Sequence, residues 1–227
     1  MMAMKLDRVV PFGRSLDEYV HMFELAPGDL KNRILGVGDG PASFNAELTA
    51  GQGNVTSVDP LYEYSADAIK ARFYQVLDNI IDQVKASPGD WIWRYHASPA
   101  HLREARIAAL ETFAGDFIKG KIAGRYVCGA LPLLPFKDGQ FDLALCSHFL
   151  FLYSDHFDAA FHYTAIREML RVAGEVRIFP LLTLMGKKSP HLTAVAGRLA
   201  GEGFTVAVRK TRYQLQRGGN EMLVIHH

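Results

Sequence analysis

The stretch RILGVGDGPA, residues 33–42, decides the fold that the sequence predicts. Residues 33–37 form a short apolar run, which is typical of a buried parallel strand. Gly36, Gly38 and Gly40 stand in or just after that run, and the segment that follows has helical spacing. Glycines let the backbone approach a ligand, and the free N–H groups at a helix start favour an anionic or polar one. The stretch therefore predicts a ligand-binding turn between a first strand and a helix.

An acid follows the second predicted strand, residues 55–58. Asp59 stands about 20 residues beyond the glycine turn, the spacing at which a carboxylate can accept hydrogen bonds from both hydroxyls of a ribose. The turn and the acid together predict a nucleoside site. The alternative for Gly38 and Gly40 is an ordinary tight turn.

Strands and helices alternate along the rest of the chain, which predicts a doubly wound α/β fold. Further strands are expected at residues 125–128, 141–146, 175–180, 204–210 and 221–226, and helices at 15–25, 44–50, 64–85, 98–119, 158–172 and 189–202. The sheet is expected to have seven mostly parallel strands and to close with a C-terminal antiparallel hairpin. The stretch between the second and third strands is too long for one crossover. We therefore expect a single domain, 1–227, with a helical insertion at about 62–122.

Composition narrows the function classes. The chain has 227 residues, 49% hydrophobic and 22% charged, and a formal charge of +1. A balanced charge gives no support to a nucleic-acid partner. The N-terminus lacks an apolar signal region and no run of 18 apolar residues occurs, so a cytoplasmic protein without a membrane partner is expected. Cys128 and Cys146 are both expected as reduced thiols in buried strands, and no metal site is predicted.

The glycine turn departs from the dinucleotide fingerprint, because Pro41 or Ser43 stands where that pattern needs Gly or Ala. The turn instead resembles motif I of the class I S-adenosylmethionine-dependent methyltransferases. Segments 134–142 (LPFKDGQFD), 144–152 and 166–179 resemble later segments of that family in the same order. The resemblance implies S-adenosylmethionine as cofactor. It also implies a set of cofactor-binding residues: Gly36, Val37, Gly38, Asp39, Gly40, Asp59, Pro60, Ala130, Leu131 and Ser147.

Two acids common in that family are missing. Gly36 stands where the family usually has an acid that orients the methionine end, and Ala130 stands where an acid often meets the adenine amino group. Asp39 either contacts the positive end of the cofactor or caps the helix that begins near Pro41. Arg14 either binds the cofactor carboxylate in compensation or is a solvated or structural arginine.

Candidate catalytic residues follow the fourth predicted strand. His148 can accept a proton near neutral pH, or it can pack as a shelf for the cofactor. Tyr153 is a second candidate, with a loop residue as the alternative. Trp91 and Trp93 belong to an aromatic segment that either lines an apolar substrate pocket or packs the insertion on the sheet.

The resemblance predicts a methyltransferase that acts on a small-molecule acceptor. The alternative is a catalytically inactive binding or scaffold protein with this fold, which the missing acids suggest. A nicotinamide oxidoreductase is third, because the dinucleotide fingerprint fails. The sequence does not identify the acceptor or the oligomeric state.

Overall fold

The computed structural model describes residues 9–227 and contains one seven-stranded sheet of order β3-β2-β1-β4-β5-β7-β6. The strands are β1 (Arg33–Val37), β2 (Asn54–Val58), β3 (Tyr126–Val127), β4 (Phe141–Ser147), β5 (Ala173–Phe179), β6 (Thr205–Lys210) and β7 (Glu221–His226). The strands β1 to β5 run parallel, whereas β7 is antiparallel to both β5 and β6. This order with a reversed β7 is the class I methyltransferase fold, so the predicted fold class is confirmed.

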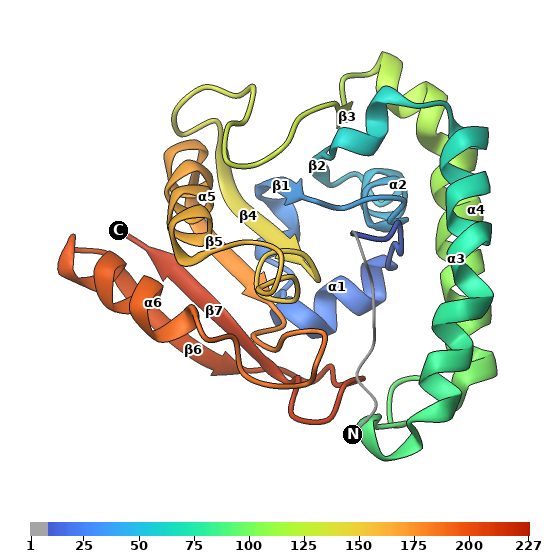
Figure 1. Ribbon diagram of the computed structural model, residues 1–227. Helices are drawn as coiled ribbons and strands as arrows, with labels where there is room; N and C mark the ends of the chain where they lie inside the picture. Colours follow the sequence, from blue (N-terminus) through green and yellow to red (C-terminus); the bar gives the residue numbers. More distant parts are fainter. Residues whose placement is uncertain (1–8) are drawn as a thin grey trace.

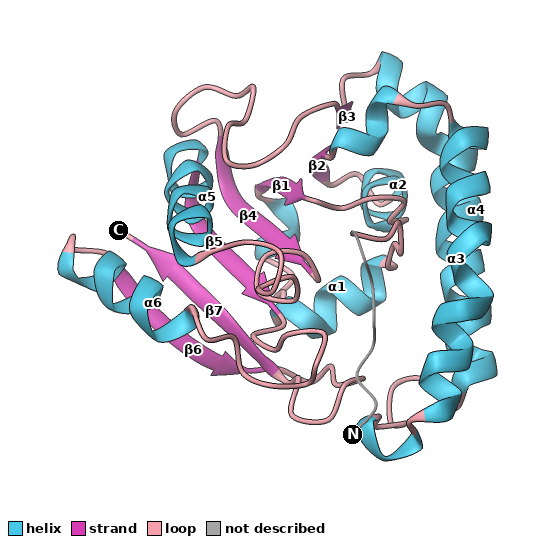
Figure 2. Cartoon of the chain, in the orientation of Figure 1, coloured by secondary structure: helices cyan, strands magenta, loops and turns pink. Residues whose placement is uncertain are grey.

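Helices cover both faces of the sheet (Figures 1 and 2). On one side lie α5 (Ala159–Val172) and α6 (Leu192–Gly201), and on the other lie α1 (Leu16–Phe23), α2 (Phe44–Ala50) and α4 (Pro99–Ile122). The helix α3 (Ala66–Ala86) packs along α4. Within residues 9–227, no helix is long and apolar enough to cross a membrane.

Local sequence signals explain where most helices begin. Ser15 and Glu18 form the expected capping box of α1, in which each side chain binds the other residue's backbone N–H. Ser98 caps α4 ahead of Pro99, as predicted. The predicted start of the last helix at Ser189 is wrong, because the Ser189 hydroxyl bonds Ser154 and the N–H of His191, and α6 begins at Leu192.

The third strand is much shorter than predicted and contains two residues. Cys128 lies beyond its end and is exposed, so the expectation of a buried thiol there is wrong. Cys146, in the central strand β4, is fully buried as expected.

The pair α3 and α4 lies between β2 and β3 in sequence, inside the stretch 62–122 predicted as an insertion. Figure 1 shows the two helices side by side at the right-hand edge of the molecule, with their far ends well below the tips of β2 and β3. They carry apolar faces, since Phe73, Leu77 and Leu110 are among their buried residues. The pair thus forms a wall beside the sheet. The description of the whole chain as one domain stays a prediction.

Candidate functional site

A cavity of about 410 Å³ lies at the carboxyl ends of the parallel strands. The last residue of each of four strands lines it: Val37, Val58, Ser147 and Phe179. Carboxyl ends of strands in open α/β sheets are where such folds bind ligands. The cavity also contains nearly all of the predicted site residues: Arg14, Val37, Gly38, Asp39, Gly40, Asp59, Pro60, Ala130, Leu131, Ser147, His148 and Tyr153. Gly36 does not line it, and the functional roles of the others stay predictions.

The glycine turn has the geometry that its sequence suggests. Gly38 and Gly40 adopt φ angles of 67° and 53°, in the left-handed region that favours glycine. The N–H of Gly38 donates to the carbonyl of Val58, and the N–H of Gly40 donates to a carboxylate oxygen of Asp59 at 2.8 Å. These bonds tie the turn after β1 to the end of β2.

Asp59 is buried and holds two loops together. One oxygen accepts from Gly40 and the other accepts from the N–H of Leu61 at 2.8 Å. Burial raises the pKa of this carboxyl to about 6, although the two backbone N–H groups oppose the shift. Since each carboxylate oxygen can accept more than one hydrogen bond, Asp59 retains acceptor capacity toward the cavity. Binding of a ribose there stays a prediction.

Asp39 occupies the space that a side chain at position 36 would need. Its carboxylate accepts from the hydroxyls of Tyr19 and Ser57, each at 2.6 Å. A Cβ built on Gly36 would lie 1.8 Å from Asp39 Oδ2. The acid missing at Gly36 is thus replaced in space by Asp39, three residues later.

The helix-capping alternative for Asp39 is wrong, because α2 begins at Phe44 with Ser43 as its N-cap residue. Burial raises the pKa of Asp39 to about 7, and bonds from Ser57 and Tyr19 offset part of that rise. The residue is therefore a buried acid that lines the cavity and titrates near neutral pH.

Arg14 is a half-buried cation whose Nε is an unused donor. Its Nη1 donates to the carbonyl of Phe12 at 2.7 Å, while Nε is buried and has no hydrogen-bond partner among residues 9–227. Burial and the nearby Arg106 lower its pKa to about 10, so the guanidinium stays charged at neutral pH. The alternative of a structural arginine, which the bond to Phe12 fits, stays open. A guanidinium with a buried, free N–H favours an anionic ligand group.

A second group of buried charges, which we term the Glu18 cluster, comprises Glu18, His96, Arg106 and Tyr213. Arg106 donates to both oxygens of Glu18, at 2.6 and 2.7 Å. The hydroxyl of Tyr213 donates to Glu18 at 3.0 Å, and His96 Nε2 lies 3.2 Å from it. The cluster joins α1 to α4 and to the loop before β7, and Arg106 and Tyr213 line the cavity.

The site role of Arg106 and Tyr213 was not predicted. The sequence signal for Arg106 is a charged residue on the buried face of the predicted helix 98–119. The capping box with Ser15 accounts for Glu18 locally, so no local signal in the sequence pairs Glu18 with Arg106.

His148 follows β4 in a left-handed conformation, with φ at 51°. Its N–H donates to the carbonyl of Phe179, and its ring Nδ1 lies 3.0 Å from the hydroxyl of Ser147. Burial, followed by the charges of Arg14 and Arg106, lowers its pKa well below the usual value. The imidazole is therefore neutral at pH 7 and can accept a hydrogen bond, while burial and the two arginines disfavour its protonated form. The packing role and the catalytic role proposed for His148 are compatible, because its ring also packs edge-on against Phe179.

The hydroxyl of Tyr153 accepts from the N–H of Val10 at 3.2 Å. This bond holds the segment before Phe12 against the cavity and leaves the phenolic O–H free to donate toward a ligand. A catalytic role for Tyr153 stays a prediction.

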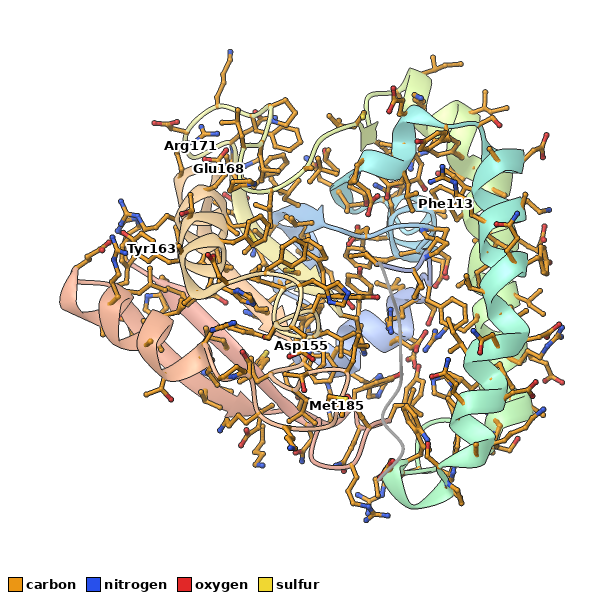
Figure 3. The ribbon with its side chains drawn as sticks, in the orientation of Figure 1. Phe113, Asp155, Tyr163, Glu168, Arg171 and Met185 are labelled. Atoms are coloured by element: carbon orange, nitrogen blue, oxygen red, sulfur yellow. The ribbon has the colours of Figure 1, made fainter. Side chains whose placement is uncertain are left out.

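The loop that carries Ala130 and Leu131 is positioned by α5. Figure 3 shows Glu168 and Arg171 together at the upper end of this helix, next to the loop. Glu168 accepts from the N–H of Leu134 at 2.6 Å, and Arg171 donates to the carbonyl of Leu134. Glu168 and Arg171 thus fix the position of this loop against α5. Within the described residues, no group of three or more His, Cys, Asp or Glu could hold a metal ion.

Comparisons with solved structures return several methyltransferases among the matches. The magnesium protoporphyrin IX methyltransferase of Synechocystis PCC 6803, solved with bound SAM, has a TM-score of 0.49 and 15% identity, over 93% of this chain and 77% of that chain. The PH0226 protein of Pyrococcus horikoshii OT3 has a TM-score of 0.49 and 11% identity, over 92% of this chain and 90% of that chain.

No protein-family model matches the sequence. Among curated proteins, the uncharacterized protein MJ0045 of Methanocaldococcus jannaschii is 32% identical over 226 residues, which is 99% of each chain. An identity of this size over the full length of both chains shows common descent. The chain therefore belongs to the same family as MJ0045.

Proposed function

We propose that this protein is an S-adenosylmethionine-dependent methyltransferase that acts on a small molecule. One observation carries the proposal: Arg14, whose buried Nε has no hydrogen-bond partner among residues 9–227, and a buried acid, Asp39, line the same cavity as the glycine turn and Asp59. A cavity with both charges suits a ligand that has an amino acid at one end and a nucleoside at the other.

The residues fit this cofactor part by part. Arg14 would bind the methionine carboxylate, and Asp39 would bind the ammonium group in place of an acid at position 36. Asp59 would accept from the ribose hydroxyls, with the Gly38–Gly40 turn close to the sugar. Ala130, Leu131 and the backbone at Pro60 would surround the adenine, which then has no acid to meet its amino group.

When bound, S-adenosylmethionine supplies a methyl group that is already strongly electrophilic, so the protein mainly has to align the acceptor and exclude water. His148 would take the proton that an acceptor hydroxyl loses, because its imidazole is neutral and hydrogen-bonded through Nδ1 to Ser147. Tyr153 would donate a hydrogen bond that orients the acceptor. We propose a cytoplasmic location on the basis of the sequence alone.

Titration calorimetry with S-adenosylmethionine, S-adenosylhomocysteine and NAD tests the proposal. We expect the first two to bind and NAD to give no heat of binding. Asp59→Ala should weaken the affinity for S-adenosylhomocysteine by at least about tenfold, which corresponds to losing one or two hydrogen bonds to a charged group. Asp155→Ala, which removes an exposed carboxyl from the β4–α5 loop, is the matched control and should bind like the wild type.

Absence of binding at millimolar concentration would contradict the proposal and favour the scaffold alternative. Unchanged affinity in Asp59→Ala would mean that the ribose contact is misplaced.

A further inference from the structure

The cavity has a second end that the cofactor residues do not use. Its walls come from the segment before α1, from the far half of α3, from the α3–α4 link, from α4 and from the β6–β7 loop. We term this end the apolar lobe, and its residues are Phe12, Ile80, Val84, Trp91, Leu102 and Leu215. Figure 1 shows that the far end of α3 and the β6–β7 loop lie at the opposite side of the molecule from the tips of β2 and β3.

The walls of the apolar lobe are hydrocarbon side chains, and the polar N–H of Trp91 is already hydrogen-bonded. The indole N–H of Trp91 donates to Ser87 at 3.1 Å, which leaves the ring itself toward the cavity. Val84 and Leu102 line the cavity, but they are only 1% and 3% exposed, so most of their surface is packed in the core. A ligand that fills this lobe must therefore be apolar over most of its surface.

The lobe is held in shape by backbone hydrogen bonds between distant segments. The N–H of Ile92 donates to the carbonyl of Leu215, and the N–H of Arg217 donates to the carbonyl of Asp90, both at 2.8 Å. These bonds connect the α3–α4 link to the β6–β7 loop. A pocket fixed in this way selects ligands by size and shape, because little side-chain or loop ordering is needed on binding.

Polar groups stand at the border of the lobe. Tyr153 accepts from the N–H of Val10, two residues before Phe12, and the ring of His148 packs edge-on against Tyr213 in the β6–β7 loop. Both residues therefore lie beside segments that form the lobe, and both have hydrogen-bonding capacity to spare. His148 accepts and Tyr153 donates, which together suit one hydroxyl group.

A charged group among the six apolar lobe residues would lose its hydration without gaining a partner there, since Arg106 is paired with Glu18 and Arg14 is assigned to the methionine carboxylate. The lobe therefore disfavours phosphates and ammonium groups.

We propose that the methyl acceptor is a small, neutral, aromatic hydroxy compound whose ring fills the apolar lobe and whose hydroxyl faces His148 and Tyr153. The rings of Phe12 and Trp91 favour an aromatic ligand, since aromatic pairs gain attraction beyond their buried area. The cavity of about 410 Å³ must also hold the cofactor, so the acceptor is a small molecule. This inference rests on the proposed function, because it assigns the lobe to the acceptor.

Calorimetry on protein saturated with S-adenosylhomocysteine tests the inference, with 2-naphthol as the probe and 2-naphthyl phosphate as its charged counterpart. We expect 2-naphthol to bind and the phosphate to bind at least about tenfold more weakly. Val84→Phe should fill the lobe and weaken 2-naphthol by at least about tenfold, with S-adenosylhomocysteine affinity within about twofold of the wild type. Ile118→Phe, on the exposed surface of α4, is the matched control and should bind 2-naphthol normally.

The two halves of the account fail in distinguishable ways. If S-adenosylhomocysteine binds but 2-naphthol does not, or binds Val84→Phe as well as the wild type, the acceptor assignment is overturned while the proposed function stands. If S-adenosylhomocysteine itself fails to bind, the proposed function and the acceptor assignment both fall. If Val84→Phe does not fold, Ile80→Phe replaces it, and retained binding of S-adenosylhomocysteine shows that either variant is folded.

Discussion

At the scale of single residues, Gly36 and Asp39 form a complementary pair. The carboxylate of Asp39 fills the volume beside Gly36, so a side chain at position 36 and the acid at 39 are mutually exclusive. Sequence comparison by position registers only a missing acid at Gly36. A contact of Asp39 with the positive end of the cofactor is one of the two alternatives that the sequence leaves open. Its overlap with position 36 depends on how the turn folds back on β1, which Tyr19 and Ser57 stabilise by hydrogen bonds.

Asp39 predicts a stability that depends on pH. Its folded pKa of about 7 lies above the usual value of 3.8, so the folded protein binds the proton more tightly than the unfolded chain does. The stabilisation is fully present below pH 4 and is lost as the pH rises toward 7. Without ligand, Asp39→Asn should therefore gain stability relative to the wild type between pH 5 and pH 8. The gain should be of order 2–4 kcal/mol, since one pKa unit corresponds to about 1.4 kcal/mol.

Urea unfolding of both proteins at the two pH values measures this difference. Asp59 also titrates in this range and its charge raises the pKa of Asp39, so the measured difference includes the coupling between the two acids. A difference in unfolding free energy that does not change with pH would show that Asp39 is not held in the protonated form by burial.

At the scale of elements, helix-capping residues and apolar periodicity predict most of the helix and strand bounds. The strand at residues 33–37 and the helix at 44–50 have the predicted bounds, and Ser15 and Ser98 start their helices as expected. The prediction failed where tertiary contacts compete with local signals. Ser189 was expected to begin a helix, but its hydroxyl is taken by Ser154.

The helix α4 is attached to the rest of the molecule through a buried ion pair, which gives a second prediction. Arg106→Met leaves Glu18 buried without its partner and should lower the free energy of unfolding by about 3–5 kcal/mol. Arg103→Met on the same helix is the matched control. Arg103 pairs with the exposed Asp78, and its loss should cost no more than about 1 kcal/mol.

Thermal and denaturant unfolding of the two variants check this prediction. Equal destabilisation by Arg106→Met and Arg103→Met would mean that the Glu18 cluster does not hold α4 in place.

At the scale of the whole molecule, the order of motifs predicted the sheet and one edge of the site. Strand ends are local in sequence, so the glycine turn, Asp59 and His148 could be found from their positions alone. The Glu18 cluster and the apolar lobe could not, because each is assembled from segments as far apart as α1 and the β6–β7 loop. For Arg14 the sequence leaves open a cofactor contact and a solvated or structural role, and its buried, unpartnered Nε is a finding of the structure.

A crystal structure of the protein soaked with S-adenosylhomocysteine tests the central claim most directly. The account predicts that the ribose hydroxyls lie within hydrogen-bond distance of Asp59 and that the carboxylate and ammonium groups meet Arg14 and Asp39. A ligand bound elsewhere, or Asp59 still bonded to Gly40 and Leu61 alone at saturating concentration, would contradict it.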